Sequence, residues 1–121
     1  MNEKFLEVIA HEGPVTIVTI NGNPAHVVNT WASYITVKAD RLLIPAAGMH
    51  SIEADFLKDN HVLLTFGSKE VEGTVGPGAG FHVLGTGQFV EAGVDFEEKK
   101  QQFPWVTRLL VVSILDVQQK I

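Results

Sequence analysis

The sequence predicts a mainly β, α+β domain built around one antiparallel sheet, and three observations support this prediction. Short runs of β-branched and aromatic residues recur along the 121 residues, and such residues favour strands. Turn residues separate most neighbouring runs, so the strands join as hairpins and pair antiparallel. Short strands at regular spacing are typical of a closed barrel. With 45% apolar residues, the chain can bury the core of a single domain covering residues 1–121.

Each expected element rests on a local pattern. Apolar residues at helical spacing predict the first two helices, and a polar segment that ends at Pro104 predicts the third. The three expected helices span residues 2–11, 48–60 and 95–103. The six expected strands span residues 15–20, 24–37, 41–44, 62–66, 81–90 and 108–117. Asn21-Gly22-Asn23 and Lys38-Ala39-Asp40 mark hairpin turns, and Pro45 ends the third strand.

Composition excludes several classes of function. The net charge is −5, which argues against nonspecific binding to nucleic acid or to an anionic membrane. Cysteine is absent, which excludes thiol catalysis and zinc–sulfur sites, and the five histidines show no metal-ligand spacing. No G-x-S-x-G motif marks a nucleophile, so no catalytic residue is assigned. Without a signal peptide or an apolar run of membrane-spanning length, a cytoplasmic protein is expected.

The glycine-rich run Gly76-Pro77-Gly78-Ala79-Gly80 lacks the Lys-Ser/Thr of a Walker loop and the strand-to-helix setting of a Rossmann turn. Two interpretations stay open. The run forms a tight corner of the barrel, or its backbone passes close to a flat ligand.

The predicted strand at residues 24–37 is unusual, because polar and aromatic residues crowd its middle. Asn29 and Trp31 alternate to one face and Thr30 to the other, so one of the two polar faces meets a ligand or a partner. The start of the second helix, near Gly48 and Ser51, offers free N–H groups that suit an anion or an ordinary cap. Trp31, Tyr34 and Trp105 suit either a core or a ligand platform.

Four motifs occur in the order and spacing of a known family: HVVNTWASY, PAAGMHSIEA, TFGSKEVEGTVGPGAGF and FPWVTRLLVV. The chain resembles the small bacterial FMN-binding members of the split-barrel flavin family, which includes pyridoxamine 5′-phosphate oxidase. The resemblance covers essentially the whole chain. It implies a six-stranded antiparallel split β-barrel with Greek-key topology and two to three short helices. It also implies one FMN, held noncovalently near a homodimer interface.

The resemblance also implies which residues hold the cofactor. The implied cofactor-binding residues are Glu12, Asn29, Thr30, Trp31, Tyr34, Ala47, Gly48, Met49, His50, Ser51, Ile52, Trp105 and Ile121, with Lys69 as a further source of positive charge. Ile121 resembles a tail that reaches the flavin of a partner subunit. Related barrels place a lysine where this chain has His50-Ser51-Ile52, so the phosphate relies on N–H groups, hydroxyls and His50.

The expected function is electron transfer, or a small FMN-dependent oxidoreductase acting with an unidentified redox partner. The residues that bind pyridoxamine phosphate are not recognisable, so that oxidase activity is not expected. The alternative is a module without redox catalysis that stores FMN or binds another flat cofactor, such as haem or F420.

Overall fold

The computed structural model describes residues 1–121 as three α-helices, one 3-10 helix and seven strands. The helices are α1 (Glu3–Ile9), α2 (His50–Asp55), α3 (Val94–Gln102) and the 3-10 helix η1 (Ala32–Tyr34). The strands are β1 (Pro14–Thr19), β2 (Val27–Trp31), β3 (Thr36–Lys38), β4 (Arg41–Ala46), β5 (His61–Glu72), β6 (Pro77–Val90) and β7 (Arg108–Gln119). The three helices form where they were predicted, although α2 is shorter. None of them is long and apolar enough to cross a bilayer.

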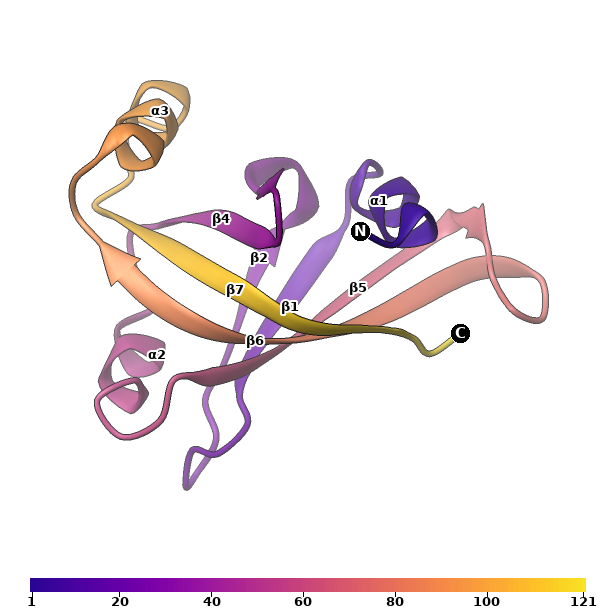
Figure 1. Cartoon of the computed structure of the whole chain (residues 1–121), viewed down its shortest axis with the longest axis horizontal. Coiled ribbons are helices and arrows are strands. Elements are labelled where there is room, and N and C mark those ends of the chain that lie inside the picture. Colours follow the sequence, from indigo (N-terminus) through magenta and orange to yellow (C-terminus); the bar gives the residue numbers. More distant parts are fainter.

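All seven strands form one antiparallel sheet in the order β2-β1-β5-β6-β7-β4-β3. The long strands β5, β6 and β7 twist across the middle of the molecule, and the sheet curls into a half-barrel (Figure 1). The prediction of an antiparallel split barrel is confirmed, whereas the strand count of six is wrong.

The additional strand arises because the segment predicted as one strand at residues 24–37 is broken by η1. The β1–β2 register continues one residue pair past Trp31, where the Ala32 N–H donates to the Gly13 carbonyl at 2.9 Å, and the strand then turns into η1. On the other side, the Lys99 Nζ donates to the Tyr34 carbonyl at 2.6 Å. Contacts with distant parts of the chain therefore hold the break, although the residues on both sides of it favour strand conformation.

The break at η1 is also the split of the barrel. β2 and β3 are consecutive in sequence but lie at opposite ends of the sheet order. Only η1 and Ile35 separate them in the chain, so the two edges of the sheet must come close together. No ladder joins these edges, so the barrel stays open along this line.

β4 continues through Pro45, which was predicted to end it. Pro45 pairs with Leu109 of β7, whereas β3 pairs only with the residues from Arg41 to Leu43. Pro45 thus lies where β4 has a neighbour on one side alone. Proline is tolerated at such an edge because its missing N–H costs no ladder bond there.

β5 and β6 form a long hairpin, and residues 66–80 extend beyond the parts that pair with β1 and β7. We call this part the β5–β6 ribbon. Its turn lies at residues 73–76, so the passage from Gly76 to Gly80 is mostly strand rather than a corner. The backbone of Gly80 is closely approached, but by the Ile121 side chain, which would lie 2.8 Å from an added Cβ.

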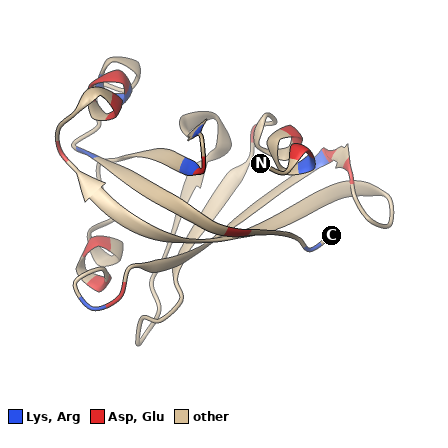
Figure 2. Ribbon diagram, viewed as in Figure 1, with Lys and Arg blue, Asp and Glu red and all other residues tan.

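The main core lies on the concave side of the sheet, where α1 covers the β5–β6 ribbon. Phe5 packs edge-on against Phe66 and Phe81, with ring centroids 5.0 and 5.8 Å apart. A smaller cluster joins Phe96 of α3 to Leu43 and Leu109. Charged residues gather on the helices and loops rather than on the middle of the sheet (Figure 2).

Candidate functional site

A shallow pocket of about 240 Å³ opens at the split of the barrel. We call it the split pocket. β2, η1, the loop from β4 to α2 and the loop from α3 to β7 form its walls. Its ten lining residues are Val28, Asn29, Thr30, Trp31, Tyr34, Pro45, Ala47, Gly48, Met49 and Trp105.

β2 supplies one wall because it is an edge strand whose free side faces the split. The Thr30 side chain is buried, whereas 47% of Trp31 is exposed. The Asn29 Oδ1 accepts a hydrogen bond from the Thr16 Oγ1 at 2.8 Å. This bond leaves the Asn29 amide NH₂ group as a donor for a ligand.

Aromatic rings form the opposite side of the split pocket. Tyr34, Phe103 and Trp105 pack together, with ring centroids 4.8 to 5.6 Å apart. Phe103 supports the other two rings from outside the lining, and 46% of Trp105 stays exposed. The result is a pre-packed aromatic surface that suits a flat ligand.

A carboxylate lies beside this pocket. The Glu12 Oε2 accepts a hydrogen bond from the Ser33 Oγ at 2.5 Å, and its Oε1 accepts one from the Ser33 N–H at 3.0 Å. The Ser33 hydroxyl and then its N–H lower the pKa of the Glu12 carboxyl below its ordinary value. Because Ser33 lies in η1, Glu12 places a fixed negative charge next to the segment that carries Trp31 and Tyr34.

The loop from β4 to α2 presents main-chain donors. The N–H groups of Gly48 and Met49 make no hydrogen bond within the chain. Met49 is left-handed, with φ of 63°, which costs a residue with a side chain about 1–2 kcal/mol. Arg108 lies behind this loop and donates to the carbonyls of Ala47 and Gly48.

Comparison with models of known protein families gives no match. The FMN-binding protein of Nitratidesulfovibrio vulgaris (strain Miyazaki F), a curated relative, is 40% identical over 116 residues, which cover 95% of this chain and 94% of the relative. The chain belongs to the FMN-binding split-barrel family.

Solved structures share the split-barrel fold. An FMN-binding protein from Syntrophomonas wolfei matches with a TM-score of 0.72 at 12% identity, over 98% of this chain and 85% of that chain. HupZ from Group A Streptococcus matches with a TM-score of 0.75 at 8% identity, over 98% of this chain and 93% of that one. At such identities the likeness concerns the fold alone.

Sequence analysis gave fourteen candidate cofactor-binding residues, thirteen from the family resemblance and Lys69 from its charge, and the structure brings eight of them together in the split pocket. These eight are Asn29, Thr30, Trp31, Tyr34, Ala47, Gly48, Met49 and Trp105. His50 and Ser51 are exposed at the start of α2, whereas the Ile52 side chain is fully buried. Glu12 does not line the pocket, but it bonds Ser33, whose chain neighbour Tyr34 does.

Lys69 and Ile121 lie apart from the split pocket of the same chain. Both line a depression on the β5–β6 ribbon, together with Gly67, Gly78 and Ala79. This depression shares no residue with the split pocket.

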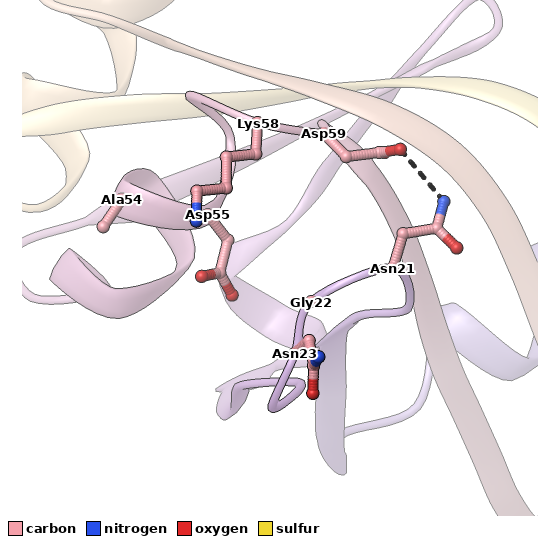
Figure 3. Close-up of a pocket in the computed structure, with 7 residues that line it drawn as sticks. All are labelled: Asn21, Gly22, Asn23, Ala54, Asp55, Lys58 and Asp59. Atoms are coloured by element: carbon pink, nitrogen blue, oxygen red, sulfur yellow. Dashed lines mark hydrogen bonds between the residues drawn. The ribbon is translucent and has the colours of Figure 1, made fainter.

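A second pocket, polar and about 330 Å³ in volume, lies between the β1–β2 loop and α2 (Figure 3). The Asp55 Oδ2 accepts a hydrogen bond from the Thr19 Oγ1 at 2.6 Å and lies 2.7 Å from the His26 Nδ1. These two bonds, the Thr19 bond first, lower the pKa of Asp55. The Asn21 side chain donates to Asp59 at 3.1 Å. The chain itself thus satisfies both carboxylates, and this pocket has no aromatic wall.

Two important residues of this split barrel escaped sequence analysis. Arg108 is an isolated cation that opens the apolar run of β7, and this isolation was the only signal of its role. Lys99 lies within the charged run Glu97–Lys100, which is typical of a solvated helix face. Its side chain is nevertheless buried, and burial lowers the pKa of its ammonium group.

Proposed function

We propose that this chain binds one FMN noncovalently in the split pocket and serves as an electron-transfer flavoprotein or a small FMN-dependent oxidoreductase. One observation carries the proposal. Half-exposed aromatic rings and unbonded main-chain N–H groups meet in a single pocket, in a chain that is 40% identical to a relative named FMN-binding protein.

The residues present fit the parts of a flavin. Trp31, Tyr34 and Trp105 offer apolar surface for a flat ring. The N–H groups of Gly48 and Met49 and the Asn29 amide are donors for the carbonyl oxygens on the polar edge of such a ring.

The phosphate is the more demanding part, because no free lysine or arginine lines the split pocket. Arg108 and Lys99 are cations that contact lining residues, but Arg108 is already engaged by two loop carbonyls and Glu53, and Lys99 by the Tyr34 carbonyl. We expect main-chain N–H groups, the hydroxyls of Thr30 and Ser51, and His50 to receive the phosphate instead. FMN affinity should then depend only weakly on salt, since few ion pairs are involved.

Bound FMN supplies one- and two-electron redox chemistry, and the protein sets where that chemistry occurs and at what potential. Glu12 stays ionised because Ser33 stabilises its charged form. A carboxylate beside the pocket disfavours added negative charge within it. Replacing it, as Glu12→Gln, should therefore make the bound flavin easier to reduce, which spectroelectrochemical titration measures as a more positive midpoint potential.

We further propose that the working form is a homodimer. At about 240 Å³, the split pocket is smaller than the ~300–1,000 Å³ of ordinary small-molecule sites. A second copy would deepen it, and the exposed apolar side chains of Leu115 and Ile121 would gain cover. Sedimentation velocity at micromolar concentration should give the mass of two chains, and a monomer mass for the FMN-loaded protein would refute this.

A spectrum of the purified protein tests the cofactor, followed by acid release and mass identification of the ligand. We expect flavin absorption bands and the mass of FMN. Parallel titration of the apoprotein with FMN, haem and F420 should show tight, stoichiometric binding for FMN alone. Tight binding of haem or F420 in its place would overturn the proposal, and FMN that cannot be reduced and reoxidised reversibly would indicate a storage module.

A further inference from the structure

Arg108 is a buried cation whose two terminal nitrogens bond the loop from β4 to α2, whereas its Nε makes no hydrogen bond. Only 6% of the residue is exposed. Its Nη1 donates to the Ala47 carbonyl at 3.3 Å and to the Thr107 hydroxyl at 3.0 Å, and its Nη2 donates to the Gly48 carbonyl. The group also stacks over the Phe89 ring at 4.9 Å. These contacts fix the direction of the guanidinium on several sides.

These bonds determine where the loop's N–H groups point. The Ala47 carbonyl and the Gly48 N–H belong to one planar trans peptide, so they point in opposite directions. The Gly48 carbonyl and the Met49 N–H are related in the same way. With both carbonyls turned towards Arg108, both N–H groups face away from it, and neither has an acceptor in the chain. Gly48 and Met49 both line the split pocket.

We propose that Arg108 is a positioning residue of the flavin site: by holding the Ala47 and Gly48 carbonyls, it aims the Gly48 and Met49 N–H groups into the split pocket. This inference rests on the proposed function, since FMN is the ligand that those donors would meet. The bond from Arg108 to the Gly48 carbonyl holds the peptide before the left-handed Met49, and the Glu53 N–H holds the Met49 carbonyl after it at 3.0 Å.

Arg108 acts through geometry and not as a charge that attracts phosphate. The Glu53 Oε1 lies 3.1 Å from the Arg108 Nε, so the pair carries little net charge. The forked guanidinium can hold two neighbouring carbonyls at once, whereas a lysine ammonium presents a single point of attachment. A lysine at this position should therefore restore the charge without restoring the fixed directions of both peptides.

The test compares Arg108→Lys and Arg108→Met with the parent protein. Because Arg108→Met removes the charge-assisted bonds that hold both loop carbonyls, we expect its Kd for FMN to rise about 10- to 100-fold. Arg108→Lys should fall between Arg108→Met and the parent protein. Fluorescence titration of apoprotein with FMN gives the Kd values, and urea denaturation of the apoproteins gives the fraction folded.

Arg41→Met is the matched control, because Arg41 is the chain's other arginine and contacts Asp95 rather than the loop. Its Kd for FMN should stay within about threefold of the parent value, a difference of less than about 1 kcal/mol. As an independent readout, the amide resonances of Gly48 and Met49 in the apoprotein should shift in Arg108→Lys and not in Arg41→Met.

The outcomes separate this inference from the proposed function. Parent-like Kd values for folded Arg108→Lys and Arg108→Met would overturn the positioning role while leaving FMN binding intact. If Arg108→Met does not fold, the Kd and the amide shifts of Arg108→Lys decide. A parent protein that binds no FMN would refute the proposed function, and the amide shifts would still test whether Arg108 orients the loop.

Discussion

Replacing Phe5 by alanine removes the side chain that fastens α1 to the β5–β6 ribbon. Phe5 is fully buried and meets the Phe66 ring at a near-perpendicular 89°. Removing a buried phenylalanine side chain costs about 3–5 kcal/mol, because the cavity only partly collapses. The free energy of unfolding of a small domain is about 5–15 kcal/mol, so this substitution should remove a large share of it.

Phe5→Leu separates the aromatic contribution from the volume. Leucine fills most of the space but loses the edge-to-face pairs with Phe66 and Phe81, each worth about 0.5–1.5 kcal/mol beyond burial. We therefore expect Phe5→Leu to lose about 1–3 kcal/mol and Phe5→Ala to lose more. The matched control is Leu6→Ala on the same helix, since Leu6 is 37% exposed and its loss should cost less than about 1 kcal/mol.

Equilibrium urea denaturation, followed by the fluorescence of Trp31 and Trp105 and by circular dichroism, measures these losses. If α1 detaches in Phe5→Ala, the native state already exposes surface and the slope of the unfolding free energy against urea should also decrease. Equal losses in Phe5→Ala and Leu6→Ala would refute the view that Phe5 anchors the helix.

Three further predictions concern the sheet and the titrating groups. Gly85→Ala should lower the free energy of unfolding by about 1–3 kcal/mol, because the added Cβ would lie 2.6 Å from a main-chain oxygen of β7. Gly76→Ala is the control, since the space around Gly76 is open, and it should change that free energy by less than about 0.5 kcal/mol. The lowered pKa of Lys99 means that the unfolded chain binds more protons above the folded pKa, so stability should rise with pH up to about 10.5, and Lys99→Met should abolish this rise. Because the pKa of Asp55 is lowered in the folded chain, its contribution to stability is complete above the unfolded pKa of 3.8 and is lost as pH falls through the folded pKa. The Asp55→Asn protein should be less stable than the parent at neutral pH, and its stability should decrease less steeply in acid.

Denaturation midpoints, recorded across pH for the two titrating groups, check all three. Equal midpoints for Gly85→Ala and Gly76→Ala would contradict the steric prediction. An alkaline rise that persists in Lys99→Met, or an acid decline that is as steep in Asp55→Asn as in the parent, would contradict the corresponding assignment.

Local patterns predicted most of the fold because they report local preferences. β-branched runs marked the strands, and the turn predicted at Lys38-Ala39-Asp40 lies at Ala39-Asp40, since Lys38 is still part of β3. The break at η1 was missed because a Glu12–Ser33 bond and the buried Lys99 hold it from far along the chain. Such contacts leave no trace in the local periodicity.

The candidate site also has a part that could be predicted from the sequence and a part that could not. Side chains of recognisable motifs, such as Asn29, Trp31 and Trp105, could be assigned from the resemblance and lie together in the split pocket. Arg108 could not be assigned, because the loop groups that it holds are main-chain carbonyls and any residue type has a carbonyl. The positions of Lys69 and Ile121 depend on how the sheet curls, which sequence spacing does not report.

The β5–β6 ribbon has a consequence for how the molecule opens. Beyond Gly80, which bonds to Lys120 and Ile121, its two strands pair only with each other. α1 covers their buried residues, such as Val71 and Ala79. A two-stranded ribbon is marginally stable alone, and a helix as short as α1 is no more stable. Helix and ribbon should therefore melt together as one subglobal unit, and their amide hydrogens should exchange at a common rate, faster than those of β1, β4 and β7. The N-terminus thus controls the protection of a hairpin tip more than sixty residues away in the chain.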